Sequence, residues 1–502
     1  MTMRFLFTTL QTYESEFYAR VGRELAAHDH EIAHVTISRA SAQALRGQGL
    51  DAHCLADVAA EVGEPADLEA EVQRLEETYD MPHIRDVYRA DWACNGRSEQ
   101  WCVARTVRTF RALERVFDGV RPDVLVPEVG NETVRVATHL IGLERGIPVL
   151  FLLYTIFPEP LRLYVDTLHA PIAGRDEVRE LTLEEREEVE AFRHAFTTAA
   201  KPIREHRRVP IELRRAKVLA GHIRRKATVD RDNEYLRPWR LVHTNASEWV
   251  RARAARPFYD RLDRSRPFVY FPLHVVDDYK ITRVIPHCRD QVSLVEQVAD
   301  ALPVGYDVVL KEHPMSVGRN SLRLLRRLRR RPNIRLVQPY TSSHELIRDS
   351  AAVAVISSTV GLEALLYEKP VLTLGDPFYA GFGVTVDVGS FAEITGRVPE
   401  LLPFRPDPER IRRFLHAAMR NCYPGAPVLV DRSEENALRL AGSIEAAAQA
   451  ALESRGKQPV SPVNALPSSA AGSASGVRDS FHNRPHGAAP AQVGPGDEHC
   501  RP

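Results

Sequence analysis

Cysteine is scarce in this chain, and neither sign of charge is in excess. The 502 residues include six cysteines, at positions 54, 94, 102, 288, 422 and 500, with no CxxC pair and no Cys/His spacing that suits zinc. This usage indicates neither a disulfide framework nor a structural metal, and a reducing cytosol fits it best. Lysine and arginine total 67, and so do aspartate and glutamate. The balanced charge therefore gives no argument for a nucleic-acid partner.

Long hydrophobic runs are also missing. The longest apolar stretch, residues 147–157, falls short of the ~20 residues that a membrane-spanning helix needs. The amino terminus, MTMRFLFTTLQTYESE, has a single arginine and no small-residue cleavage site, so we interpret it as a first strand instead of a secretory signal. We therefore expect a cytoplasmic protein.

The length suits two domains, because a single hydrophobic core stops growing at roughly 250 to 300 residues. We predict an α/β protein of two Rossmann-type lobes with parallel sheets. The expected parts are an amino-terminal lobe at 1–174 with a helical insertion at 56–120, a helical basic connector at 175–255, a second lobe at 256–402, carboxy-terminal helices at 403–454 and a disordered tail at 455–502.

Alternating strands and helices are clearest in the second lobe. Apolar runs predict strands at 268–272, 307–311, 334–338, 353–357 and 371–374, and helical spacing predicts helices at 289–302, 320–330, 343–349 and 360–368. Such regular alternation predicts a doubly wound parallel sheet. In the first lobe we expect strands at 4–8, 31–38, 124–127 and 149–154.

The connector contains a strongly basic stretch. Residues 201–226 hold ten Lys or Arg against two acids, Glu205 and Glu212. A solvated helical face explains this pattern, and so does a patch that rests on anionic lipid head groups, so the stretch by itself does not choose. It lacks the interleaved aromatics of a single-stranded nucleic-acid site, which argues against a nucleic-acid partner.

Hydroxyl residues follow a buried strand in the segment AVAVISSTVGLEALLYEKPVL. Ser357, Ser358 and Thr359 stand at the turn into a helix. A helix start has free N–H groups and a partial positive charge, so it suits a phosphate. One hydroxyl would suffice as a helix cap, and three in a row leave donors for a ligand. Glu363, which we expect in the first helical turn, either reaches ribose hydroxyls or only complements the helix dipole.

A second group of polar residues follows the strand at 307–311. His313 and Pro314 come directly after it, and the proline fixes the backbone where the strand leaves the sheet. Ligands of an open parallel sheet bind beyond the carboxyl ends of its strands, so the imidazole is placed to donate to a phosphate oxygen or to neutralise a departing nucleotide. Lys311 either adds positive charge or extends to solvent.

With these motifs in place, the stretch from FVYFPLH (268–274) through KEHP (311–314) to SSTVGLEALLYEKPVLTLG (357–375) resembles the bacterial capsular polysaccharide biosynthesis family, which includes transferases of the sugar acid Kdo. The resemblance implies a GT-B architecture, with a donor in the second lobe and an acceptor in the first. It also implies that His313, Pro314, Ser357, Ser358 and Thr359 hold the phosphate of a CMP-sugar.

This resemblance implies a glycosyltransferase with a nucleotide-sugar donor and a glycan or glycolipid acceptor, and with neither cofactor nor metal. The acceptor hydroxyl must lose a proton, so a carboxylate is needed in the first lobe. Glu128 and Glu132, in PEVGNE after a strand, are the candidates. A UDP-sugar-dependent transferase or epimerase and a non-catalytic assembly protein with the same fold remain as alternatives.

Overall fold

Two parallel sheets organise the protein. The computed structural model describes residues 2–200 and 213–456, with backbone only for residues 213–217, and these residues belong to one compact unit. The predicted 201–212 part of the basic stretch and the tail from 457 onward lie outside the described residues. The predicted α/β class with two GT-B-like lobes is confirmed by the pairing of the strands.

The first sheet has the order β3-β2-β1-β4, and all its strands are parallel. These strands are β1 (Arg4–Thr9), β2 (Glu31–Thr36), β3 (Asp51–Cys54) and β4 (Val124–Pro127). The chain moves outward from β1 to β3 and then returns to the other side of β1. The topological switch point, where such sheets place their ligand crevice, is therefore between β1 and β4.

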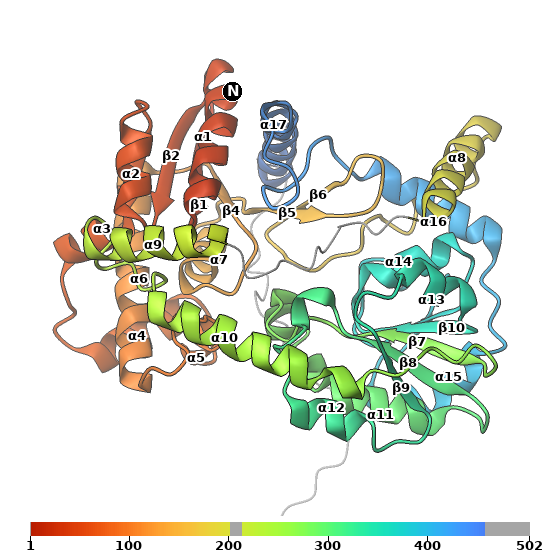
Figure 1. The fold of residues 1–502 in the computed structure, drawn as a ribbon. Coiled ribbons are helices and arrows are strands. Elements are labelled where there is room, and N and C mark those ends of the chain that lie inside the picture. Colours follow the sequence, from red (N-terminus) through yellow and green to blue (C-terminus); the bar gives the residue numbers. More distant parts are fainter. Residues whose placement is uncertain (1, 201–212, 457–502) are drawn as a thin grey trace, which may run out of the picture. The chain divides into compact units, whose positions relative to one another are not determined.

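Helices surround this sheet (Figure 1). They are α1 (Thr12–Ala27), α2 (Arg39–Arg46), α3 (Leu55–Val62), α4 (Leu68–Thr78), α5 (Arg85–Tyr88), α6 (Glu99–Val120) and α7 (Thr133–Glu144). The sequence missed β3, which has only four residues, two of them partly or fully exposed.

One expected strand of the first lobe pairs differently. The segment predicted at 149–154 is β5 (Leu150–Tyr154), which forms an antiparallel pair with β6 (Leu161–Val165). Its link to the parallel sheet is one bridge between Leu125 and Val149. The chain reverses at once after β5, where the Thr155 amide donates to the Pro160 carbonyl at 2.8 Å, and this turn fixes the antiparallel pairing.

The second sheet has the order β12-β11-β10-β7-β8-β9, with parallel neighbours. Its strands are β7 (Phe268–Pro272), β8 (Asp307–Lys311), β9 (Ile334–Val337), β10 (Ala352–Val355), β11 (Val371–Thr373) and β12 (Val386–Asp387). The helices are α11 (Gln291–Ala301), α12 (Leu322–Leu328), α13 (Ser343–Asp349), α14 (Thr359–Leu366) and α15 (Ile394–Leu401). The chain moves outward from β7 through β8 to β9 and then returns to the other side of β7 at β10. The switch point of this sheet is therefore between β7 and β10.

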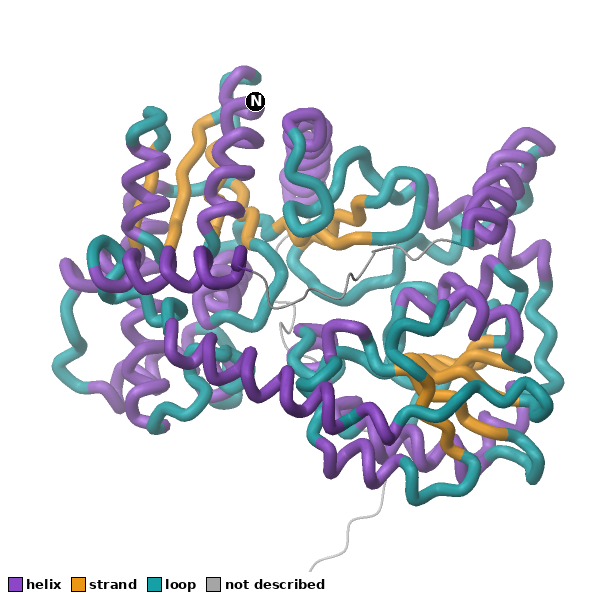
Figure 2. Tube along the Cα trace, viewed as in Figure 1, coloured by secondary structure: helices purple, strands orange, loops and turns teal. Residues whose placement is uncertain are grey.

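Both faces of the second sheet are covered by helices (Figure 2). Strand β7 shows the reason, because Val269 and Phe271 belong to one hydrophobic cluster while Phe268 and Tyr270 belong to the cluster on the opposite face. Side chains of a strand alternate between faces, so a strand that is apolar throughout must be buried on both sides.

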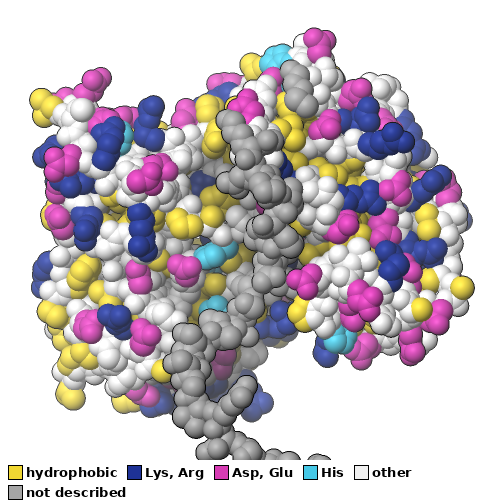
Figure 3. Space-filling view, turned by 180° about the vertical axis from the view of Figure 1, so that it is seen from behind, with side chains coloured by type: hydrophobic (Ala, Val, Ile, Leu, Met, Phe, Trp, Pro, Cys, Tyr) yellow, Lys and Arg dark blue, Asp and Glu magenta, His cyan; other side chains and the backbone are white. Residues whose placement is uncertain are grey.

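The remaining helices connect and cover the lobes. They are α8 (Leu183–Ala199), α9 (Leu213–Ala227), α10 (Pro238–Ala254), α16 (Pro408–Arg420) and α17 (Glu434–Gly456). Helix α17 packs on α1, where Leu440 and Ile444 join the same apolar cluster as Phe17 and Val21. On the outside, basic and acidic side chains are interspersed, as Figure 3 shows for one side of the molecule.

Candidate active site

His274 is the central residue of the second-lobe site. It follows β7, and its Nε2 accepts the backbone N–H of Ser357 at 3.2 Å, after β10. The two residues therefore face each other across the switch point. Burial, together with the nearby charges of Lys280 and His313, lowers the pKa of His274 to about 3. A neutral imidazole at this position can hold the turn after β10 without adding charge.

His313 lies on the other side of His274, because β8 pairs with the opposite edge of β7. Its Nδ1 accepts the backbone N–H of Met315 at 3.2 Å. An Nδ1 that accepts a hydrogen bond is not protonated, so the proton of the neutral ring is on Nε2, which can then donate. Pro314 starts the short 3₁₀ turn that begins here, where a missing N–H leaves no bond unmade.

The three hydroxyl residues at the start of α14 have different roles. Ser358 is the N-cap and accepts the backbone N–H of Val360 at 3.2 Å. Thr359 is the first helical residue, and its hydroxyl is hydrogen-bonded to Glu363. Ser357 precedes both, and all three side chains are half-buried. We expected hydroxyl donors to remain for a ligand after one had capped the helix. Ser358 is this cap, and Thr359 is also engaged, by its contact with Glu363 inside the helix.

Glycine is required at position 361 of this helix. A Cβ there would lie 2.0 Å from the Oη of Tyr379 and 2.7 Å from its Cζ. The Tyr379 ring is fully buried, and its hydroxyl donates to the Ser358 carbonyl. Tyr379 therefore supports the turn at Ser358, at a distance that only glycine permits.

Glu363 and Lys311 are placed differently from our expectation. Helix α14 begins at Thr359, so Glu363 is in its second turn, and the expected position in the first turn is wrong. Glu363 is only 4% exposed, and burial raises its pKa to about 7 although Lys311 opposes the rise. Lys311 is also buried, with a pKa lowered by burial to about 8, and it donates to the Thr341 carbonyl at 3.0 Å and to the Ser343 hydroxyl. Lys311 therefore does not extend to solvent.

Three carboxylates gather at the switch point of the first lobe around Arg135, which is at 2.9 Å from Glu14 and 3.3 Å from Glu132. The Tyr18 hydroxyl donates to the third carboxylate, Glu128, which is 6% exposed. Burial raises the pKa of Glu128 to about 7, Glu14 adds to the rise, and Arg135 opposes it. A carboxyl with a pKa close to neutral is suited to act as a general base.

Glu132 is half-buried beside Arg135. It is the N-cap residue of α7, and burial raises its pKa while Arg135 lowers it. A Cβ on Gly130 would lie 2.1 Å from the Glu132 carboxylate and 2.5 Å from Arg135. A larger residue at position 130 would therefore displace the charged ends of both side chains.

A short π-helical segment joins the two clusters. Residues Lys280–Val284 form this segment, which starts six residues after His274. From it, Arg283 donates to the Gly130 carbonyl and the Thr282 hydroxyl donates to the Asn131 amide oxygen, both at 2.8 Å. Single turns of π-helix are frequently found at functional sites. The segment therefore brings two cations, Lys280 and Arg283, between the imidazoles of the second lobe and the carboxylates of the first.

These two cations are unusual in their surroundings. Burial lowers the pKa of Lys280, and the charge of Arg162 lowers it further although Asp278 opposes this. Burial also lowers the pKa of Arg283 to about 10. Cations whose charged form is disfavoured are stabilised when an anion binds beside them.

A cavity of about 580 Å³ opens beside this carboxylate cluster. One wall comes from the apolar side of α3, and the opposite wall is polar. The polar lining consists of Arg39, Glu64, Arg105, Arg108, Thr109, Asp232, Asn233 and Glu234.

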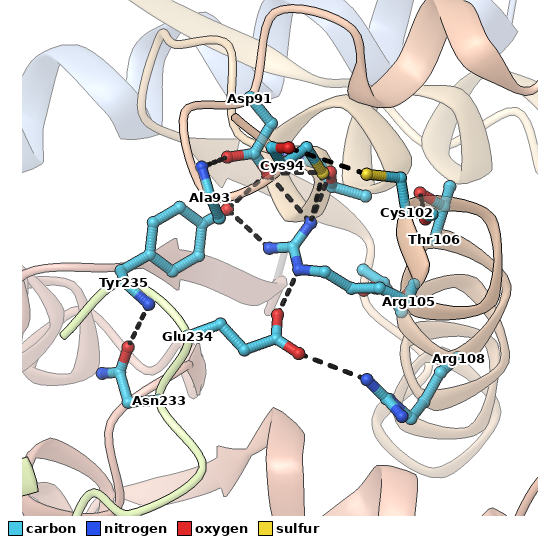
Figure 4. Close-up of polar contacts among 12 residues, drawn as sticks. Asp91, Ala93, Cys94, Cys102, Arg105, Thr106, Arg108, Asn233, Glu234 and Tyr235 are labelled. Carbon is cyan, nitrogen blue, oxygen red and sulfur yellow. Dashed lines mark hydrogen bonds and ion pairs between the residues drawn. The ribbon is translucent and has the colours of Figure 1, made fainter. Parts of the chain in front are cut away.

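Arg105 is the centre of the polar wall (Figure 4). It contacts Asp91 at 3.0 Å and also pairs with Glu234, and Tyr235 receives a hydrogen bond from it at 2.9 Å. The same guanidinium donates to the hydroxyl of Thr133, the neighbour of Glu132, at 2.8 Å. The hydrogen-bonded network of the cavity thus reaches Thr133, the residue that follows Glu132 of the carboxylate cluster in the chain.

Sequence reasoning did not select His274, Lys280 or Arg283 as site residues. His274 carried a usable signal, because it directly follows a strand of the sheet. Lys280 and Arg283 carried no such sequence signal, since they lie in a loop of mixed composition. Among the described residues, no three His, Cys, Asp or Glu side chains form a group that could hold a metal ion. No helix of the described ranges is long and apolar enough to span a bilayer.

The fold and these two clusters define a two-lobed protein of the GT-B-like class. Residues 211–400 match the model of the family described as capsule polysaccharide biosynthesis protein. The match contains His274, His313 and the turn at 357–359, so the predicted resemblance to this family is confirmed over these residues.

Two curated relatives match shorter stretches. Protein FixF of Sinorhizobium fredii is 30% identical over 171 residues, which cover 33% of this chain and 40% of that protein. The capsule polysaccharide modification protein LipA of Neisseria meningitidis serogroup A is 31% identical over 100 residues, which cover 19% of this chain and 14% of that protein. The chain thus spans less than half the length of either relative.

Solved structures resemble the chain more distantly. KpsC of Thermosulfurimonas dismutans, described as a β-Kdo 2,7 transferase, is 16% identical with a TM-score of 0.32, covering 64% of this chain and 88% of that one. The UDP-GlcNAc 2-epimerase of Neisseria meningitidis is 15% identical with a TM-score of 0.30, covering 91% of this chain and all of that one. Similarity at this level supports no conclusion about activity.

Proposed function

We propose that this chain is a glycosyltransferase of surface polysaccharide biosynthesis, and that it transfers a Kdo-like 2-keto acid sugar from a CMP-activated donor to a glycan or glycolipid acceptor. One observation carries the proposal: His274 contacts the turn after β10 while its imidazole interacts with His313 after β8. Three strand ends thus meet at the switch point of the donor lobe, where an open sheet binds its ligand.

The phosphate of the donor is held by α14 and His313. The first N–H groups of α14 point at the anion, and the Nε2–H of His313 donates to it from the opposite side. Lys311 is already bonded to Thr341 and Ser343, so it is not placed to hold a second phosphate. This favours a monophosphate donor such as a CMP-sugar over a UDP-sugar, and the reaction as proposed needs neither a cofactor nor a divalent metal.

The carboxylate of the donor sugar is recognised by Lys280 and Arg283. Both cations are half-buried, and burial lowers the pKa of each. A bound carboxylate would stabilise both charged forms. This supports an acidic sugar, because the phosphate is the only anion that a donor with a neutral hexose brings, and the phosphate is placed at α14 and His313 in this proposal.

The reaction is a single substitution at the anomeric carbon. The acceptor oxygen forms a bond to that carbon while the bond to the phosphate oxygen breaks, and CMP leaves with the electron pair. Glu128 takes the proton of the acceptor hydroxyl, as its pKa of about 7 allows. Glu132 and Arg135 position this carboxylate cluster.

The acceptor enters the first lobe through the cavity of about 580 Å³. Its arginines are paired with carboxylates, as Arg39 is with Asp57 and Asp232. Paired charged side chains offer many hydrogen bonds but little net charge, which suits the hydroxyl groups of a glycan. The apolar wall of α3 suits the less polar face of a sugar ring.

Ligand-induced thermal stabilisation tests the donor assignment. We expect CMP to raise the melting temperature of the wild type, UDP to raise it less, and His313→Ala to abolish the effect of CMP. A stronger effect of UDP would reject the CMP assignment and favour a UDP-sugar enzyme.

Release of CMP from CMP-Kdo in the presence of an acceptor tests the enzyme assignment. Glu128→Gln should slow release on the order of 10²-fold or more, with CMP-induced stabilisation unchanged, because the base acts on the acceptor. Equally slow release of CMP by the wild type, Glu128→Gln and His313→Ala would identify a non-catalytic protein. Chelation of divalent metals with EDTA should leave the rate unchanged.

A further inference from the structure

Helix α10 presents its apolar face outward. Four large apolar side chains of this helix are exposed: Trp239 by 82%, Val242 by 40%, Trp249 by 45% and Val250 by 57%. No residue of α10 is fully buried. A surface helix normally buries its apolar stripe against the core. Helix α10 differs, because its apolar stripe faces outward.

The exposed residues form one continuous stripe. The exposed positions are 239, 242, 243, 246, 249, 250, 253 and 254, which follow one another by steps of one or three residues. Residues with this spacing share one face of an α-helix. The opposite face makes the contacts that hold the helix: Arg251 donates to the Gly318 carbonyl at 2.6 Å, and Glu248 is 3.5 Å from Arg319.

No acidic residue lies on this stripe. Its charged member is Arg253, whose guanidinium is 4.1 Å from the ring centroid of Trp249. The neighbouring helix α9, which contacts α10 (Figure 1), has no Asp or Glu in its 15 residues and has Arg224, Arg225 and Lys226 in its last turn. Arg225 pairs with Asp230 at 2.7 Å and Lys226 donates to the carbonyls of Arg231 and Asn233, so Arg224 is the exposed cation of this turn. Val218 and Ile223 of α9 are exposed as well.

We infer that the exposed stripe of α10, together with α9, docks on a membrane surface that contains anionic phospholipid. Tryptophan prefers the boundary between head groups and acyl chains, because its ring is apolar and its N–H is polar. An interfacial helix has these features: aromatic and aliphatic residues on one face and Lys or Arg nearby.

The absence of acidic residues on the stripe favours a membrane surface over a second copy of the chain as the binding partner. In a symmetric dimer the same patch faces itself, so Arg253 and the basic end of α9 would meet like charges. An anionic lipid surface instead attracts exposed basic side chains such as Arg253 and Arg224. For the described part of the basic stretch, in α9, the inference favours lipid contact over a solvated face, the two interpretations that the sequence left open.

Flotation of the full chain with lipid vesicles tests this inference. We expect binding to vesicles of phosphatidylcholine with about one third phosphatidylglycerol, and little binding to phosphatidylcholine alone. The double variant Trp239→Ser/Trp249→Ser should bind at least about tenfold more weakly, since two large apolar side chains are lost from the interface. Release of CMP with a soluble acceptor should stay at the wild-type rate.

The matched control is Leu183→Ser/Val304→Ser. These two apolar residues are also exposed, by 74% and 106%, but lie outside α9 and α10, so their removal should leave vesicle binding unchanged. Equal binding by the wild type and the Trp239/Trp249 variant would overturn the inference. So would a dimer in sedimentation equilibrium that the Trp239/Trp249 variant converts to a monomer while vesicle binding stays absent.

Discussion

Adding a single methyl group at position 361 should damage the donor site. In Gly361→Ala the new Cβ would lie 2.0 Å from the Tyr379 hydroxyl oxygen, well inside van der Waals contact. Tyr379 has no free space to move into, because its side chain is fully buried. The ring must shift, and its hydrogen bond to the Ser358 carbonyl is then lost.

The expected cost combines three effects. Overpacking of a well-packed core costs about 1 to 3 kcal/mol, and the lost hydrogen bond costs about 1 kcal/mol. Alanine is better than glycine in a helix by up to about 1 kcal/mol, which offsets part of this. The net destabilisation is therefore about 2 kcal/mol. A domain of 150 to 250 residues loses roughly 2 to 4 °C per kcal/mol, so we expect a melting temperature lower by about 5 °C.

Thermal unfolding with and without CMP measures both consequences. The stability loss should appear without ligand, and the stabilisation by CMP should shrink, because the turn at Ser358 moves with Tyr379. Gly396→Ala is the matched control, since Gly396 is also helical and an added Cβ there meets no atom within 4 Å. This control should be neutral or slightly stabilising, with an unchanged response to CMP.

Two results would refute the reasoning. If Gly361→Ala melts at the same temperature as Gly396→Ala, the close approach of Tyr379 does not exist in solution. If Gly361→Ala is destabilised but CMP still stabilises it as strongly as the wild type, the turn at Ser358 does not contact the donor phosphate.

Three further predictions concern buried groups and the helix cap. Arg105→Met should cost about 3 to 5 kcal/mol in urea unfolding, because it leaves the buried carboxylate of Asp91 without its ion pair, and a loss below about 1 kcal/mol would contradict the buried network. Ser358→Ala should cost about 1 kcal/mol by the same measurement and Ser357→Ala clearly less, since only Ser358 caps α14; equal losses would contradict the cap assignment. The turnover rate should rise as the pH increases through about 7, because Glu128 must be ionised to act as the base. Tyr18→Phe should move the midpoint of this rise to higher pH, since the Tyr18 hydrogen bond lowers the pKa of Glu128. An unmoved midpoint would exclude Glu128 as the base.

The sequence by itself determined the local structure around the candidate sites. Apolar runs of four to six residues placed β1, β4, β7, β8 and β10, because strands buried on both faces admit few polar residues. It also placed polar residues at their carboxyl ends, where a parallel sheet binds ligands. His313, the turn at 357–359 and Glu128 were selected in this way.

Only the tertiary structure decided which of these residues meet. The order of the strands puts β7 between β10 and β8, so His274 lies between Ser357 and His313 although 83 residues separate His274 from Ser357 along the chain. Pairing of strands far apart in sequence depends on how whole layers pack, and no local pattern contains it. The same applies to Arg105, whose partners Asp91 and Tyr235 are 14 and 130 residues away.

The orientation of α10 was likewise beyond local reasoning. Its sequence shows an apolar stripe at helical spacing, and such a stripe ordinarily predicts a buried face. The contacts of Arg251 and Glu248 fix the helix by its polar side instead, so the stripe with Trp239 and Trp249 faces outward. A helical pattern determines which residues share a face, and only packing against the rest of the fold determines where that face points.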